Sequence, residues 1–190
     1  MENYQNPEYF DSILEEKRRF FQNVFGIELA DFSGLKLPLR PEGDLAYDLL
    51  IKPRGLNMQE IIKLNRSDCK IMVDARIDLG AIDIRADGSK YKTSIGWIID
   101  SLKADYVGSH SQMSHHDTET ISDRLIHGLF VYYKTQRHLD EIQPTITKSY
   151  IMLKDRYPLV VKFSGGGMLV SYLPKNTFGG GRIVRDRIEF

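Results

Sequence analysis

Imidazole and carboxylate side chains are concentrated in one short stretch of this sequence. All five histidines lie between positions 110 and 138, and four potential metal ligands follow one another closely: His110, His115, His116 and Asp117. Neutral imidazoles and carboxylates are suitable ligands for zinc and other divalent metals. We therefore weigh a metal site here against a solvated polar loop, which is favoured because adjacent histidines often point apart and no standard metal motif matches.

A second candidate constellation is the pair Asp123 and His127, which are spaced by one helical turn. Such a pair stabilises a helix modestly when it is exposed. A general acid–base role would also require a cleft beside it. The spacing alone predicts an exposed ion pair on the polar side of a helix.

Basic residues are concentrated toward the end of the chain. Residues 143–190 contain eight lysines and arginines against three acidic residues, and they end with Arg182, Arg185 and Arg187. These arginines are candidate ligands for an anion or for a nucleic-acid strand, which would stack on the neighbouring aromatic residues. Because the whole chain has 26 basic and 26 acidic residues, it lacks the basic excess of a general nucleic-acid binder. Nucleic acid is therefore not the expected partner.

The remaining motifs do not favour a catalytic site. The only cysteine, Cys69, cannot form an intramolecular disulfide and precedes a strand-like segment, so we interpret it as a small core residue. The two Gly-Gly-Gly runs, at 165–167 and 179–181, are not followed by the Lys-Ser/Thr of a phosphate-binding loop and predict turns. We assign no catalytic residue and no cofactor other than the divalent metal considered above.

The elements that would position these residues follow from periodicity. Apolar residues recur at helical spacing from Pro7 to Phe25, after which Gly26 predicts the helix end, and again over 118–137. A short helix is expected over 58–64 behind Asn57. Strand-like stretches occupy 48–52, 70–77, 81–85, 91–99, 145–153, 159–163, 168–173 and 182–190, with Asp87-Gly88 as a hairpin turn. Residues 101–117 are expected to form a surface loop.

This pattern predicts an α+β fold in which a mostly antiparallel sheet is packed by two long amphipathic helices. No linker or low-complexity tract divides the 190 residues, so we expect a single domain over 1–190. The sequence shows no secretory signal and no apolar run long enough to cross a membrane. With its single cysteine, the chain is expected to be cytoplasmic.

Three stretches resemble a family of small uncharacterised bacterial proteins. They are Asp31-Phe-Ser-Gly-Leu with Pro38, the segment from Thr120 to Asp140, and the closing Arg182-Ile-Val-Arg-Asp-Arg-Ile. The similarity is collinear over about residues 28–190 and departs most over 102–117. It implies a bacterial, cytosolic origin, and it carries over no activity and no functional residue.

These observations lead to one preferred function and two alternatives. A non-enzymatic binding or protein-interaction domain is preferred, with a protein partner or a homodimer formed through a sheet edge or the first helix. The alternatives are a metal-dependent hydrolase using the His110–Asp117 loop and an anion or nucleic-acid binder using the basic C-terminal strands. Whether the chain is an enzyme stays open at this level.

Overall fold

The computed structural model describes residues 7–32, 37–41, 46–81, 92–99, 106–109, 117–139, 144–153, 155–164, 166–174 and 177–190. Within these residues the α-helices are α1 (Pro7–Phe25), α2 (Met58–Leu64) and α5 (Ile121–Thr135), with a 3₁₀ turn at Leu79–Ala81. Its strands are β1 (Tyr47–Lys52), β2 (Lys70–Val73), β3 (Ser94–Ile99), β4 (Tyr106–Ser109), β5 (Thr145–Met152), β6 (Arg156–Ser164), β7 (Gly167–Tyr172), β8 (Phe178–Gly181) and β9 (Arg185–Glu189).

The strands form two sheets rather than the single sheet expected. A three-stranded antiparallel sheet has the order β1-β3-β9, and a six-stranded sheet has the order β2-β7-β6-β5-β8-β4. The larger sheet is mixed, because β2 pairs with β7 in parallel and β5 pairs with β8 in parallel. The α+β class is therefore confirmed, but the sheet is divided and contains parallel pairs.

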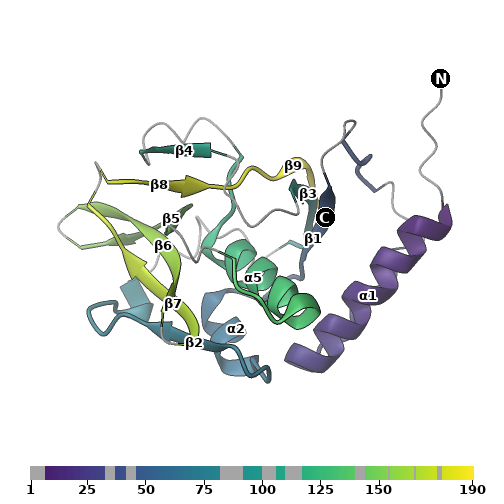
Figure 1. Ribbon diagram of the computed structural model, residues 1–190, viewed down its shortest axis with the longest axis horizontal. Coiled ribbons are helices and arrows are strands. Elements are labelled where there is room, and N and C mark those ends of the chain that lie inside the picture. The colour runs from purple at the N-terminus through teal and green to yellow at the C-terminus, as the bar shows by residue number, and fades with distance from the viewer. Residues whose placement is uncertain are drawn as a thin grey trace.

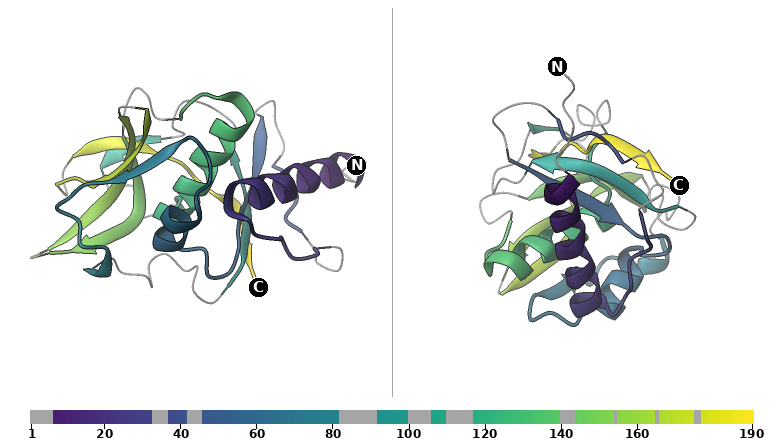
Figure 2. Two further views of the ribbon diagram at one scale, coloured as in Figure 1. Left: turned by 90° about the horizontal axis from the view of Figure 1, so that it is seen from below. Right: turned by 90° about the vertical axis from the view of Figure 1, so that its right-hand side faces the viewer.

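Helix α5 lies between the two sheets, and α1 lies beside the three-stranded sheet and packs against α5 through Phe20 and Phe130 (Figures 1 and 2). The helix contacts β1 of one sheet and β5 and β6 of the other, and it also contacts α2. One cluster of buried apolar residues extends from Leu14 in α1 to Val184 near the C-terminus and includes Trp97 and Phe130. Burial of these side chains supplies most of the drive to fold.

The helix ends follow the local sequence. Thr120 begins α5 with a capping box, in which its side chain accepts a hydrogen bond from the Asp123 amide while the Asp123 carboxylate accepts one from the Thr120 amide. Asn57 caps α2 through the amide of Glu60. Gly26 follows α1 with a φ of 67°, a left-handed conformation that glycine adopts without steric penalty. All three predicted helices are therefore present with close to the expected bounds.

Two sequence predictions differ from the fold. Residues 106–109, expected within a loop, form strand β4, and the glycine run 179–181, expected as a turn, belongs to strand β8. Glycine has low strand propensity, so neither strand shows the β-branched pattern that predicts one. The hairpin expected at Asp87-Gly88 lies outside the described residues. No helix in the described part of the chain is long and apolar enough to span a membrane.

Candidate functional site

The predicted metal ligands are only partly within the described structure. His110, His115 and His116 lie outside it, whereas Asp117 lies at its edge and is 41% exposed. The Asp117 carboxylate accepts hydrogen bonds from Lys148 at 2.7 Å and from Arg187 at 3.0 Å. Both of its oxygens thus face cationic side chains. A metal site in this stretch stays a prediction.

The three candidate anion-binding arginines make different contacts. Arg182 is fully buried, and its Nη1 lies 3.4 Å from the carbonyl oxygen of Ile99. Arg185 is half-buried, with its guanidinium 5.5 Å from the centre of the Tyr47 ring. Arg187 is ion-paired with Asp117 and Asp123. The anionic partners of Arg187 among the described residues are carboxylates of the chain itself, and its Nη1 also donates to the Ser94 hydroxyl at 3.2 Å. Anion binding by the three arginines stays a prediction.

The aromatic residues that accompany these arginines do not share one set of contacts. Phe163 stacks on His138, with the ring centres 3.8 Å apart. Tyr157 packs edge-on against Tyr172 in the neighbouring strand. Phe178 is exposed on β8. Phe163, the Tyr157–Tyr172 pair and Phe178 therefore have three separate sets of contacts and do not form one stacking row.

The expectation of an exposed Asp123–His127 pair is wrong. Both side chains are buried, as are all side chains of α5 from Ile121 to Val131. The prediction assumed that one side of the helix faces solvent, but α5 is covered by a sheet on each side. Asp123 instead pairs with Lys52 and Arg187, which are distant in sequence, and His127 pairs with Glu119, which precedes the helix.

Asp123 is the centre of an ion-pair network that connects α5 to β1 and β9, the two outer strands of the three-stranded sheet. Its Oδ2 lies 2.9 Å from Nη2 of Arg187 in β9, and its Oδ1 lies 3.6 Å from Nζ of Lys52 in β1. The network continues from Arg187 to Asp117 and from there to Lys148 in β5. Burial alone would raise the pKa of Asp123, but Lys52 and Arg187 outweigh burial and hold its pKa well below the usual range.

A second group of polar side chains surrounds His127. The Nδ1 atom of His127 lies 3.1 Å from Glu119 Oε1, and Arg124 Nη1 lies 3.7 Å from the other oxygen of Glu119. Burial and the nearby Arg124 and Arg182 lower the pKa of His127 well below its usual value, so the imidazole is neutral. Nδ1 thus lies beside both the Glu119 carboxylate and Nη1 of Arg124, which is 3.4 Å away. Within the described structure, Nε2 of His127 has no hydrogen-bond partner.

A third buried pair links α1 to the small sheet. Lys17 Nζ lies 2.7 Å from Oδ2 of Asp48 in β1 and 3.1 Å from the centre of the Phe130 ring. Burial lowers the pKa of Lys17 to about 8, and the adjacent Asp48 carboxylate opposes that shift. The pair therefore fixes the position of α1 against β1 and α5.

Together these buried ion pairs hold the helices and the small sheet in place. Asp123, Glu119 and Asp48 each face at least one cation, and their side chains are at most 10% exposed. A group that exchanges protons or binds substrate needs access to a cleft, and these groups instead hold α5 between the sheets. The pairs Lys17–Asp48, Lys52–Asp123 and Asp123–Arg187 join residues that are dozens of positions apart, so no local motif connects them. Glu119 is only eight residues before His127, but it precedes the helix and was not considered as its partner.

The lone thiol is also interior. Cys69 is buried, and burial raises its pKa to about 11. Its Sγ lies 4.0 Å from Nδ1 of His138, whose ring lies between Tyr132 and Phe163. A thiol with this pKa is a poor nucleophile at neutral pH. The raised pKa is in keeping with the interpretation of Cys69 as a core residue.

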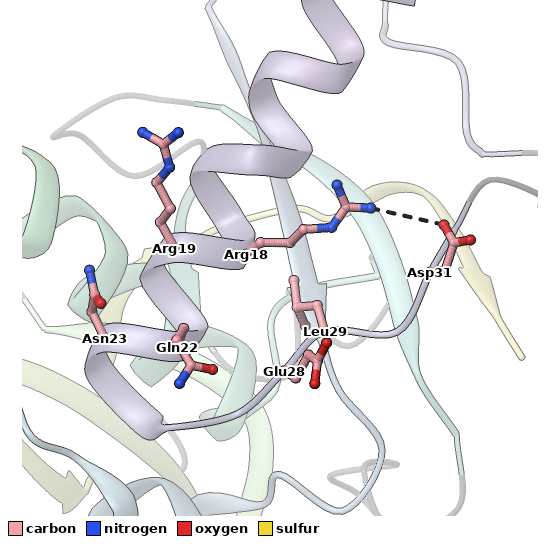
Figure 3. Close-up of a pocket in the computed structure, with 7 residues that line it drawn as sticks. All are labelled: Arg18, Arg19, Gln22, Asn23, Glu28, Leu29 and Asp31. Carbon is pink, nitrogen blue, oxygen red and sulfur yellow. Dashed lines mark ion pairs between the residues drawn. The ribbon is translucent and has the colours of Figure 1, made fainter.

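A surface depression of ≈ 500 Å³ lies beside the last turns of α1 (Figure 3). Residues of both charges line it: Arg18, Arg19, Gln22, Asn23, Glu28, Leu29 and Asp31. Arg18 extends toward Asp31 at 4.0 Å, while Arg19 points away and pairs with Glu15 (Figure 3). Because the lining charges oppose one another, the depression has no preference for a ligand of one sign.

The described surface also has an exposed apolar strip at the edge of the large sheet. Strand β4 is the last strand in the sheet and pairs antiparallel with β8 (Figure 1). Val107 in β4 is 59% exposed and Phe178 in β8 is 67% exposed. Val107 is paired with Gly180, two residues from Phe178, so the two side chains lie on the same face of the ladder. We call these strands, with Val107 and Phe178, the β4–β8 edge.

Comparisons with models of known protein families, with curated proteins and with solved structures find no match for this chain.

Proposed function

We propose that this chain is a non-enzymatic protein-interaction domain whose β4–β8 edge binds an extended, uncharged segment of a protein partner. The observation that carries the proposal is the pair of exposed apolar side chains, Val107 in β4 and Phe178 in β8, at a sheet edge where no further strand of the described residues pairs with β4. An edge strand presents unpaired N–H and C=O groups that a further strand can bond. Apolar side chains beside that edge favour a partner that removes them from water.

The four sheet edges of the described fold differ in a way that favours β4. Strand β1 is buried at every position, and β9 carries the charged sequence Arg-Asp-Arg-Ile-Glu. Strand β2 begins with the exposed Lys70. Charges on an edge discourage pairing with another chain. Strand β4 has the sequence Tyr-Val-Gly-Ser and carries no charge, so it lacks this protection.

The buried networks around α5 support the non-enzymatic part of the proposal. The ionisable groups of α5 that sequence reasoning considered for chemistry are enclosed by protein and face opposite charges. They give the two sheets a fixed relative position. A rigid sheet whose edge is already extended pays little conformational entropy when a second strand binds to it.

The proposal is tested by selecting random displayed peptides on the wild-type chain. Selected peptides should be rich in uncharged, β-forming residues, and their affinity should fall at least about tenfold on Val107→Lys, which places a charge on the edge. The matched control is Leu39→Lys, which alters an apolar residue of similar exposure, 65%, before β1. Equal peptide binding by Val107→Lys and Leu39→Lys, or failure to select any peptide on a chain that is monomeric, would refute the proposed function.

A further inference from the structure

We infer that the partner strand at the β4–β8 edge is β4 of a second copy of this chain, paired antiparallel across a two-fold axis at Gly108. This inference rests on the proposed function and names its partner. Three features of β4 favour this partner: the direction of its backbone groups, the register that those groups allow, and the charge and side chains of the edge.

The direction of the backbone groups follows from the strand on the other side of β8. The amide of Gly180 donates to the carbonyl oxygen of Pro144 at 3.0 Å, toward β5, with which β8 pairs in parallel. In an extended strand the N–H and C=O of one residue point to the same side. Gly180 therefore turns away from β4, and its pairing with Val107 is a non-hydrogen-bonded pair. The N–H and C=O of Val107 consequently point to the free edge.

The same alternation assigns the rest of the strand. Tyr106 and Gly108 are opposite Gly181 and Gly179 and form the hydrogen-bonded pairs with β8. Position 109, two residues after Val107, has its backbone groups toward the free edge as Val107 does. The groups that β4 offers to a new strand are thus those of positions 107 and 109.

One antiparallel register of two β4 strands uses all of these groups. With Gly108 opposite Gly108 of the second copy, each Val107 lies opposite position 109 of the other strand, and both pairs are hydrogen-bonded pairs. A register centred on Val107 would pair only the Val107 groups within the described strand. A two-fold axis also makes the contact isologous, so that the assembly closes as a dimer.

The side chains and charge of the edge suit a second copy. Val107 and Phe178 lie on one face of the ladder, with Gly180 beside them offering no side chain. Antiparallel pairing brings the strips of both copies onto one face of a continuous sheet. The edge carries no charge, and the chain has 26 basic and 26 acidic residues, so two copies do not repel each other over long range.

Sedimentation equilibrium of the full chain measures the dimerisation. We expect a reversible dimer whose dissociation constant rises at least about tenfold in Val107→Lys, because symmetry introduces the charge twice. Leu39→Lys should dimerise as the wild type does. Buried Trp97, the only tryptophan, reports whether each variant is folded. A wild-type chain that stays monomeric, or a folded Val107→Lys variant that dimerises equally well, would overturn the inference.

Cysteine cross-linking tests the register. Opposed residues of a hydrogen-bonded antiparallel pair have Cα atoms about 5.5 Å apart, within the range of a disulfide. Mixing Val107→Cys with Ser109→Cys should therefore give cross-linked heterodimers faster than either variant alone. The natural Cys69 is buried and does not compete. Equal cross-linking of each variant alone would contradict the Gly108-centred register.

The two proposals can fail separately. If the chain is monomeric but selected peptides bind it in a Val107-dependent manner, the edge binds another protein and only the self-pairing is refuted. If neither a dimer nor a Val107-dependent peptide is found, the proposed function is refuted as well.

Discussion

Replacing Asp123 by asparagine should be among the most destabilising conservative substitutions in this chain. The Asp123 side chain is fully buried, with Arg187 at 2.9 Å and Lys52 at 3.6 Å, and it accepts a hydrogen bond from the Thr120 amide. Asparagine keeps the shape and an oxygen for the helix cap. The substitution therefore removes the negative charge that the two buried cations share, and it places an NH2 group where Oδ1 faces Lys52.

The magnitude follows from the burial of those cations. The side chains of Lys52 and Arg187 are 3% and 9% exposed. Removing one member of a buried ion pair destabilises a protein by about 3–5 kcal/mol. We expect the lower end, about 3 kcal/mol, because Arg187 keeps its second carboxylate, Asp117, at 3.0 Å.

Asp117→Asn is the matched control, since it removes the other carboxylate from the same arginine. Asp117 is 41% exposed, so its ion pairs are screened by water and should contribute less than about 1 kcal/mol. Urea unfolding followed by Trp97 fluorescence gives the free energy of unfolding of both variants. If Asp123→Asn is no more destabilising than Asp117→Asn, the buried network does not hold α5 as described.

The pH dependence gives a second test of the same carboxylate. Asp123 has a lower pKa in the folded chain than the usual value near 4. Its stabilising contribution is therefore complete above about pH 4 and is lost as the pH falls toward the folded pKa. The difference in stability between wild type and Asp123→Asn should shrink in acid. A difference that is constant with pH would contradict the assigned ionisation.

Three further predictions concern other buried positions. Gly167→Ala should lower the free energy of unfolding by about 1–3 kcal/mol, because the new Cβ would collide with the Lys70 carbonyl; Gly80→Ala, which faces only a flexible side chain, is the control. Burial lowers the pKa of His127, so below about pH 6.5 the unfolded chain binds a proton that the folded chain does not. The free energy of unfolding from urea titrations should therefore rise with pH in this range, by up to about 1.4 kcal/mol per pH unit, and His127→Gln should lose this contribution. The pKa of Lys17 is lowered to about 8 in the folded chain, so between about pH 8 and 10.5 the unfolded chain binds more protons than the folded chain. The free energy of unfolding of the wild type should therefore rise with pH in this range relative to that of Lys17→Met. Equal dependence of the two free energies on pH would contradict this prediction.

The sequence predicts where the helices begin and end, but it does not predict which elements cover them. Pro7 and Gly26 bound α1 as expected, and the periodicity over 118–137 identifies α5. Periodicity describes one helix at a time, however, and assumes a single buried face. It could not show that α5 lies between two sheets, where Asp123 and His127 are both buried. The partners of Asp123, Lys52 and Arg187, are on β1 and β9, and no local pattern specifies how those strands are arranged around the helix.

Local sequence patterns also did not predict the two strands of the candidate interface. Strand β4 contains a glycine, and three of the four residues of β8 are glycine, so both lack the β-branched signature of a strand. Exposure of Phe178 becomes visible only when β8 is placed near the edge of the large sheet. The histidine cluster, in contrast, was conspicuous in sequence, but His110, His115 and His116 lie outside the described residues.

The most direct test of the β4–β8 edge as a pairing surface is the concentration dependence of amide hydrogen exchange at Val107. Its amide points to the free edge in a single copy, so pairing of β4 is expected to protect it. We predict that exchange at Val107 slows as the protein concentration rises, while exchange at Gly108, already bonded to β8, changes much less. Exchange at Val107 that is fast and equally so at all concentrations would contradict strand pairing between copies at this edge.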